Sequence, residues 1–142
     1  MQLNLFNYYQ YDQHLPVFRE IIKTSPLKWN LIEIENLPKR WLKVICIKYK
    51  LPYSSTRSQL FINILNFVDL ARLVKANFDQ DSEIREFTLK EKPPYKIKEI
   101  KPVLKRLNIR HSWLRKNEKL ILAKNQFITR WKFKPVWKNY NL

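Results

Sequence analysis

The absence of glycine constrains the fold of this chain more than any other feature. None of its 142 residues is Gly, while 8 are Pro. Glycine is the residue that most readily forms tight hairpins and ends helices in the left-handed conformation. The phosphate-binding loop of nucleotide hydrolases and the dinucleotide-binding fingerprint both require it, so both are excluded. The sequence therefore predicts a mainly α protein whose helices are joined by Pro, Asn and Ser turns.

The charge of the chain limits the kind of partner that it binds. Lys and Arg number 28 against 12 acidic residues, which gives a formal net charge of +16. Hydrophobic residues make up 45% of the chain, enough for a real core. A compact state with this much positive charge repels itself unless a polyanion screens it. Nucleic acid is the commonest polyanion, and an anionic membrane surface comes second. The membrane surface is disfavoured because the lysines spread around the expected basic helices and leave no large apolar face.

Cysteine and hydropathy patterns indicate where such a protein works. The single cysteine, Cys46, excludes an internal disulfide and a zinc site built from cysteines. No run of about 18 apolar residues is present, so no membrane span is expected. The first ten residues lack the basic start and apolar stretch of a secretion signal. We expect an intracellular protein, cytoplasmic or associated with a nucleoid or nucleus, rather than a secreted one.

The positive charge lies in two blocks. Residues 36–58 carry six bases and no acid, and residues 93–142 carry fourteen bases and two acids. Between them, residues 79–92 have a net charge of −2 and end just before two consecutive prolines. This pattern indicates two anion-facing surfaces. The expected organisation is an N-terminal aromatic segment at 1–36, a helical hairpin with an extended second helix at 37–78, a linker at 79–95 and a basic region at 96–142.

Residues 37–67 have the periodicity of a helical hairpin. A first helix is indicated by apolar residues at i, i+3, i+4 and i+7, namely Leu42, Ile45, Cys46 and Tyr49. The pair Leu51-Pro52 ends that helix, and Thr56 with Gln59 has the spacing of a capping box. A second helix should therefore begin at about Arg57. Its apolar face comprises Leu60, Ile64, Phe67 and Val68.

The same segment resembles the SAP DNA-binding motif. The matching residues are Leu37, Leu42-Lys43, Leu51-Pro52, Ser54, Thr56-Arg57, Gln59-Leu60, and Ile62 or Leu65 further on. The resemblance covers 31 of the 142 residues. Two glycines of the motif are replaced here, by Lys50 before Leu51-Pro52 and by Ser55 in the turn. We therefore expect either strain at Ser55 or a turn of different conformation.

The resemblance implies DNA binding by the end of the first helix, the turn and the start of the second helix. The chemistry of these residues agrees, since the free N–H groups at a helix start favour an anion and the neighbouring lysines supply charge. Ser54, Ser55 and Thr56 are also expected to act as turn and cap residues, a role compatible with phosphate binding. Trp41 and Tyr49 are expected in the core rather than as stacking platforms.

The C-terminal basic region has the pattern of two further amphipathic helices, at 97–107 and 115–127. At an offset of 58, Leu42, Ile45, Cys46, Tyr49, Leu51 and Ser54 align with Ile100, Val103, Leu104, Leu107, Ile109 and Ser112. Beyond the turn, Leu60 and Phe67 align with Leu120 and Phe127 at an offset of 60, which needs a longer loop. Either this is a degenerate second hairpin, with Arg110, His111, Ser112, Arg115 and Lys116 at its turn, or two amphipathic helix pairs align by chance.

The two ends of the chain are rich in aromatic residues. Residues 130–138 alternate basic and aromatic side chains, the pattern of a short strand or an extended tail. Such a segment either stacks unpaired bases or, the interpretation that we favour, packs an aromatic edge on the core. The N-terminal cluster of Phe6, Tyr8, Tyr9 and Tyr11 packs with this tail or forms a surface for a protein partner.

The sequence indicates a binding protein and not an enzyme. His14 and His111 have no carboxylates at a recognisable spacing, and Cys46 lies on an apolar helix face where an inert thiol is expected. We expect no cofactor and no metal ion. The expected function is low-specificity binding of duplex DNA, with DNA favoured over RNA. The alternatives are an accessory or targeting subunit of a larger DNA- or RNA-processing complex and a structural RNA-binding protein of the ribosomal type. The candidate nucleic-acid-binding residues are Lys39, Lys43, Lys48, Lys50, Ser54, Ser55, Thr56, Arg57, Ser58, Arg110, Arg115, Lys116, Arg130, Lys132 and Lys134.

Overall fold

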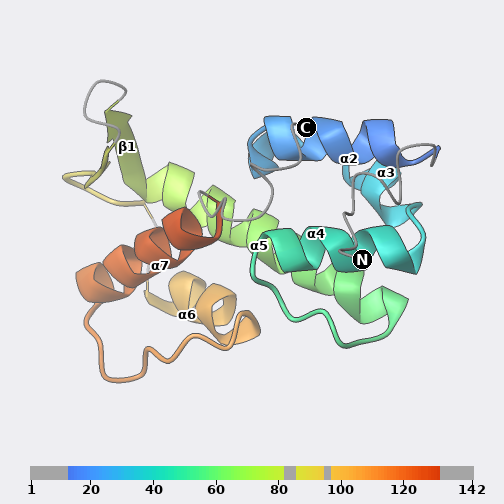
Figure 1. The fold of residues 1–142 in the computed structure, drawn as a ribbon. Helices are drawn as coiled ribbons and strands as arrows, with labels where there is room; N and C mark the ends of the chain where they lie inside the picture. The colour runs from blue at the N-terminus through green and yellow to red at the C-terminus, as the bar shows by residue number, and fades with distance from the viewer. Residues whose placement is uncertain (1–12, 82–85, 95–96, 132–142) are drawn as a thin grey trace, which may run out of the picture. The chain divides into compact units, whose positions relative to one another are not determined.

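The computed structural model describes residues 13–81, 86–94 and 97–131, and this part of the chain is mainly helical, as the sequence predicts (Figure 1). Its elements are α2 (Leu15–Lys23), the 3-10 helix η1 (Pro26–Lys28), α3 (Leu31–Glu35), α4 (Lys39–Lys48), α5 (Arg57–Asn77), β1 (Phe78–Asp81), β2 (Glu86–Leu89), α6 (Ile97–Arg106) and α7 (Lys116–Trp131). They form two compact units, whose boundary falls inside α5 between Ile64 and Leu65. Among the described residues, no helix is both long and apolar enough to cross a membrane.

Three short helical segments open the first unit, where the sequence predicted only an aromatic segment at 1–36. In α2 the residues at i, i+3 and i+6, Leu15, Phe18 and Ile21, are buried. The indole N–H of Trp29 donates to the carbonyl of Ile21 over 3.0 Å, which fixes η1 against the end of α2. The ring centroid of Phe18 lies 5.2 Å from that of Trp41, so α2 packs on α4. The segment at 13–36 is therefore part of the core of the first unit.

The predicted hairpin of α4 and the start of α5 forms the rest of the first unit. The four residues of the predicted apolar face of α4 are all buried, as is Trp41. Burial raises the pKa of the Cys46 thiol to about 12, and its Sγ donates to the carbonyl of Leu60 over 3.6 Å. The thiol is therefore protonated and inert, as expected. The predicted face of α5 is buried too, and the helix begins at Arg57.

The second unit is built around the aromatic side chains of α5 and α7. The ring of Phe127 lies 5.7 Å from that of Phe67 and 6.4 Å from that of Phe87, and it stacks on Trp131 at 5.4 Å. Three elements, α5, β2 and α7, thereby meet at one residue. The aliphatic residues Ile100, Leu104, Ile109, Leu120 and Ala123 complete the core of α6 and α7.

The expected linker at 79–95 contains an antiparallel strand pair. The register pairs Phe78 with Leu89 and Asp79 with Thr88, and the N–H of Lys90 donates to the carbonyl of Asn77 over 2.9 Å. The interpretation as a solvated connector rested on the acidic residues and the proline pair. It does not hold for residues 79–81 and 86–89, which form the strands, because the buried Phe78 and the Phe87 ring attach these strands to the aromatic core.

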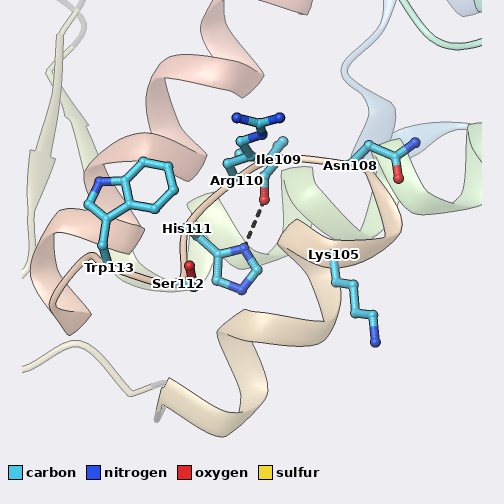
Figure 2. A pocket seen from close by; sticks show the side chains of 7 residues that line it. All are labelled: Lys105, Asn108, Ile109, Arg110, His111, Ser112 and Trp113. Carbon is cyan, nitrogen blue, oxygen red and sulfur yellow. Dashed lines mark hydrogen bonds between the residues drawn. The ribbon is translucent and has the colours of Figure 1, made fainter.

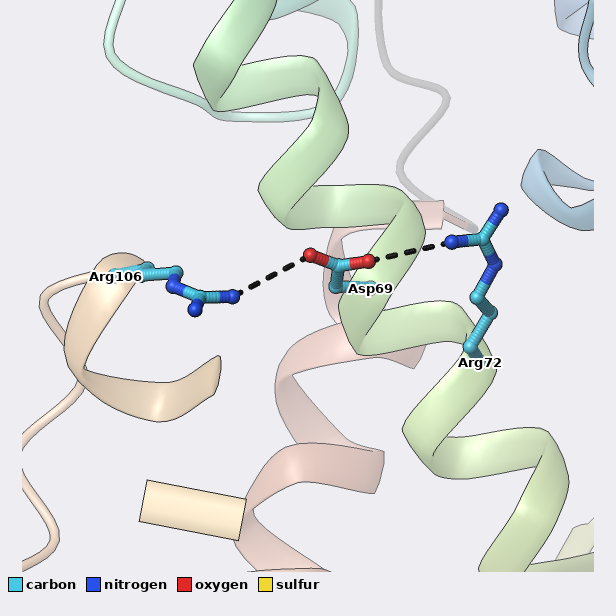
Figure 3. Close-up of polar contacts among 3 residues, drawn as sticks. All are labelled: Asp69, Arg72 and Arg106. Carbon is cyan, nitrogen blue, oxygen red and sulfur yellow. Dashed lines mark hydrogen bonds and ion pairs between the residues drawn. The ribbon is translucent and has the colours of Figure 1, made fainter. Parts of the chain in front are cut away.

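A carboxylate links α5 to α6 within the second unit. The Asp69 carboxylate lies 3.5 Å from the guanidinium of Arg72 and 3.5 Å from that of Arg106 (Figure 3). Both arginine side chains are more than half exposed, so these ion pairs contribute less than about 1 kcal/mol. Their main consequence is that the guanidinium of Arg106 is already paired with a carboxylate and is not available to an anionic ligand.

The C-terminal strand that the alternating pattern predicts does not begin at Arg130. Helix α7 continues to Trp131, whose ring stacks on that of Phe127 one turn earlier at an interplanar angle of 19°. The residues four apart on a helix face each other, and this aromatic pair favours helix over strand. Lys132, Lys134 and the rest of the expected tail lie outside the described residues, as does the N-terminal aromatic cluster.

Candidate nucleic-acid interface

The first turn, residues 49–56 between α4 and α5, starts with a left-handed residue. Lys50 has a φ of 56°. The N–H of Leu51 donates to the carbonyl of Cys46 over 2.8 Å, and that of Lys50 to the carbonyl of Ile47 over 3.2 Å. These two bonds define a Schellman motif, the arrangement that commonly has glycine at the left-handed position. Lys50 thus occupies the left-handed position that glycine commonly takes in this motif.

The second turn, residues 107–115 between α6 and α7, starts in the same way. Asn108 has a φ of 58°. The N–H groups of Ile109 and Asn108 donate to the carbonyls of Leu104 and Lys105, each over 3.0 Å. All four residues lie 58 positions after their counterparts in the first turn. The correspondence found in the sequence therefore extends to the backbone.

The replacement of the second SAP glycine by Ser55 causes no left-handed strain. Among the described residues, positive φ occurs only at Lys50 and Asn108. Thr56 caps α5, since its Oγ1 accepts the N–H of Gln59 over 3.3 Å, as the capping-box spacing predicts. The Gln59 side chain donates to Asn63 over 2.9 Å instead of returning to the cap. Of the two expectations for Ser55, the structure therefore favours a turn without a left-handed residue at this position over strain.

Other polar side chains of the first turn hold the fold together. The guanidinium of Arg57 donates to the carbonyl of Leu37 over 3.1 and 2.8 Å and also to that of Glu35. The buried amide of Asn63 donates to the carbonyl of Pro52 over 2.9 Å. Arg57 and Asn63 therefore satisfy backbone carbonyls on either side of α4. These bonds explain the position of the Arg57 guanidinium without a bound phosphate.

The lysines of the first hairpin differ in exposure. Lys48 is only 5% exposed, and its Nζ lies 5.3 Å from the centroid of the Tyr49 ring, so it is not part of a surface for phosphate. Lys39, Lys43 and Lys50 are exposed. The Nζ of Lys43 lies 5.9 Å from the ring of Tyr53, a weak cation–π contact within the turn. Ser54 and Ser58 are exposed, and Ser55 is half-buried.

The second turn forms an open pocket of about 480 Å³ (Figure 2). Its lining comprises Lys105, Asn108, Ile109, Arg110, His111, Ser112 and Trp113. Lys105, Arg110 and Arg115 are exposed, and Lys116 is half-buried. Within the part of the chain that the structure describes, the side chains of Lys105, Arg110 and Arg115 make no hydrogen bond or ion pair. Three cationic groups are thus available around one turn.

Internal bonds fix the backbone of the second turn. The ammonium of Lys119, a residue only 2% exposed, donates to the carbonyl of His111 over 2.9 Å. The same carbonyl accepts the N–H of Leu114 over 3.0 Å. The Nδ1 of His111 lies 2.8 Å from the carbonyl of Ile109, which can only accept, so Nδ1 carries a proton and Nε2 is the nitrogen left for a ligand.

Arg130, the remaining described candidate, is part of the packing of α7. Its side chain is half-buried and donates to Gln126 Oε1 over 3.3 Å. Desolvation by burial lowers the pKa of its guanidinium from the ordinary value. Arg130 therefore lies on α7 away from the second turn. The other described candidates lie in the two turns or on the helices that flank them: Lys50, Ser54, Ser55 and Thr56 in the first turn, Arg110 and Arg115 in the second, Lys39, Lys43 and Lys48 on α4, Arg57 and Ser58 at the start of α5, and Lys116 at the start of α7.

Three residues that line the pocket of the second turn were missed among the candidates predicted from the sequence: Lys105, Asn108 and Trp113. The available signal was a tryptophan within the basic run RHSWLRK, next to a predicted helix end.

No protein family, curated protein or solved structure matches this chain. Within the described residues, no group of three or more His, Cys, Asp or Glu side chains is arranged to hold a metal ion.

Proposed function

We propose that this protein binds nucleic acid with low sequence specificity, that duplex DNA is its preferred form, and that exposed cations of the two hairpins make the phosphate contacts. The observation that carries the proposal is a set of exposed cations on two hairpins whose first helices end with the same backbone geometry. In the first hairpin the set comprises Lys39 and Lys43 on α4 and Lys50 in the turn. In the second it comprises Lys105 at the end of α6 and Arg110 and Arg115 in the turn. The net charge of +16 adds a long-range attraction to any polyanion.

The chemistry of these groups supports positioning on a phosphate backbone rather than reading of sequence. Lysine and arginine cations bind phosphate oxygens, which are the same at every base pair. Ser54 and Ser58 add exposed hydroxyl donors beside the first turn. Base reading in the major groove depends on a helix or strand ribbon that presents several side chains to base edges. The proposal therefore specifies electrostatic binding with a strong salt dependence.

Titration of duplex DNA of mixed sequence across a range of salt concentrations tests this function. With about five phosphate contacts, the plot of log affinity against log salt should have a slope of about −4 to −5. Competition with single-stranded DNA and structured RNA of equal length measures the preference for duplex. Heparin serves as the control for charge alone, and duplex DNA should bind more tightly per charge. No binding at low salt, or a flat slope, would contradict the proposal.

A further inference from the structure

Trp113 is the most exposed aromatic residue among the described large hydrophobic side chains. Its exposed fraction is 68%, although tryptophan is usually well buried. Single exposed apolar side chains are common and need no explanation by themselves. Trp113 differs because it lines a pocket together with Lys105, Arg110 and His111. In Figure 2 the imidazole of His111 lies between the indole of Trp113 and the ammonium of Lys105.

The backbone that carries Trp113 is held in place before any ligand arrives. The carbonyl of His111, two residues before Trp113, accepts two hydrogen bonds. One comes from the buried Lys119 ammonium and the other from the N–H of Leu114. The Schellman motif at Asn108 fixes the other end of the pocket. Because the turn is already ordered, a ligand that stacks on the indole does not have to order the loop, which favours affinity.

In the part of the chain that the structure describes, no cation lies over the ring of Trp113, in contrast to the exposed aromatic ring of the first turn. Tyr53 is 47% exposed, but the Lys43 ammonium lies 5.9 Å from its ring centroid. Within the described residues, Trp113 makes no ring or cation contact. Its neighbours Lys105 and Arg110 are cations without internal partners, so a ligand with both an aromatic face and negative charge fits the pocket.

We infer that the second turn binds an unpaired nucleobase together with its flanking phosphates. Trp113 stacks on the base, Lys105 and Arg110 bind the phosphates, and His111 Nε2, Ser112 and Asn108 offer hydrogen bonds to the base edge. The volume of about 480 Å³ lies within the range of small-ligand pockets. This inference rests on the proposed function, nucleic-acid binding by the two hairpins, and goes beyond its duplex preference. Bases inside a duplex are stacked on each other and leave no face for Trp113, so the second turn takes an unpaired segment of the nucleic acid.

The inference is tested by fluorescence anisotropy with labelled oligothymidylate, with the same strand carrying abasic sites, and with duplex DNA. Trp113→Ala should weaken binding of oligothymidylate by about tenfold, the usual size of one base–aromatic stack. Trp113→Phe should recover most of that loss. The matched control Tyr53→Ala should change the affinity less than twofold, and Trp113→Ala should have an equally small effect on duplex DNA and on the abasic strand. Because Trp113 is exposed, these variants should fold normally.

A further probe, oligouridylate, shows whether the base or the sugar is recognised. The outcomes that would contradict each proposal distinguish the base-stacking site from the proposed function. Oligouridylate should show the same loss with Trp113→Ala if the base and not the sugar is recognised. An equal loss on duplex and single strand, the same loss with the abasic strand, or no loss on oligothymidylate would each overturn the base-stacking site. Failure of the wild-type protein to bind any of these polymers at low salt would instead overturn the proposed function.

Discussion

The hairpins α4–α5 and α6–α7 end their first helices in the same way and use their turns differently. Each has a Schellman motif with a left-handed residue other than glycine, Lys50 in one and Asn108 in the other. In the first turn, Thr56 and Arg57 bind the backbone of their own unit, and Lys48 is buried. In the second turn, Arg110 and Arg115 project from a backbone that other groups hold.

The difference shows that the hairpin with the SAP-like sequence is not the hairpin with more side chains free to bind a ligand. The segment that resembles a SAP motif uses Thr56, Arg57 and Asn63 for caps and carbonyl contacts. The second hairpin, for which the sequence suggested no family, carries the free arginines and the exposed Trp113. Arginine binds phosphate through a planar fork with several donors, while lysine acts as a point charge. We therefore expect the second hairpin to contribute more of the affinity.

Removal of three exposed cations from each hairpin tests this ranking and should give the largest effect. The variant Lys105→Ala, Arg110→Ala, Arg115→Ala should weaken duplex binding at low salt by about a hundredfold and flatten the salt slope by about 3. The variant Lys39→Ala, Lys43→Ala, Lys50→Ala removes the same charge and should lose about tenfold. Titrations at matched salt measure both. Equal losses would contradict the ranking, and a larger loss from the first hairpin would make that hairpin the principal site.

Arg57 provides a second test, of stability instead of binding. Arg57→Ala should lower the free energy of unfolding by about 1–2 kcal/mol, because the carbonyls of Leu37 and Glu35 lose a charged donor. Arg57→Lys keeps the charge but not the planar fork, so it should also destabilise the protein. Arg110→Ala, the control from the second turn, should change stability by less than about 0.5 kcal/mol. Urea unfolding gives the three values.

The outcome at Arg57 separates the structural role from the binding role. The folded Arg57→Lys variant should bind duplex DNA nearly as well as the wild-type protein. A loss of DNA affinity without loss of stability in Arg57→Ala would show that this side chain contacts phosphate, as the SAP resemblance implies, and that its bonds to the backbone are incidental.

Local patterns predicted what depends on local physics. The helix faces, the start of α5 at Arg57 and the Thr56 cap follow from periodicity and side-chain spacing. The strand pair at 78–89 depends on the contact of Phe87 with Phe127, forty residues away in the chain. The burial of Lys48 and the bond of Arg57 to Leu37 likewise depend on tertiary packing. No spacing rule encodes such contacts.

The sequence predicted that the second turn is basic, but not which of its side chains are unpaired or exposed. The basic run at 110–116 indicated an anion-facing turn. Which cations stay free, however, depends on their neighbours: Arg106 faces Asp69, while Arg110 has no acid beside it among the described residues. The exposure of Trp113 could not be predicted, because tryptophan in an apolar-rich chain is expected to be in the core.

The left-handed residues that the two hairpins share offer the smallest and most specific test. Lys50→Gly should raise the free energy of unfolding by about 0.5–1 kcal/mol, because glycine adopts positive φ without a steric penalty. Asn108→Gly should gain less, since asparagine tolerates this conformation better than lysine. Lys50→Ala controls for the removed charge and should bring no gain, because alanine keeps the Cβ that crowds the backbone. Chemical unfolding of the three variants gives the comparison. A gain from alanine equal to that from glycine would show that charge repulsion at Lys50, and not its backbone conformation, limits the stability of the first hairpin.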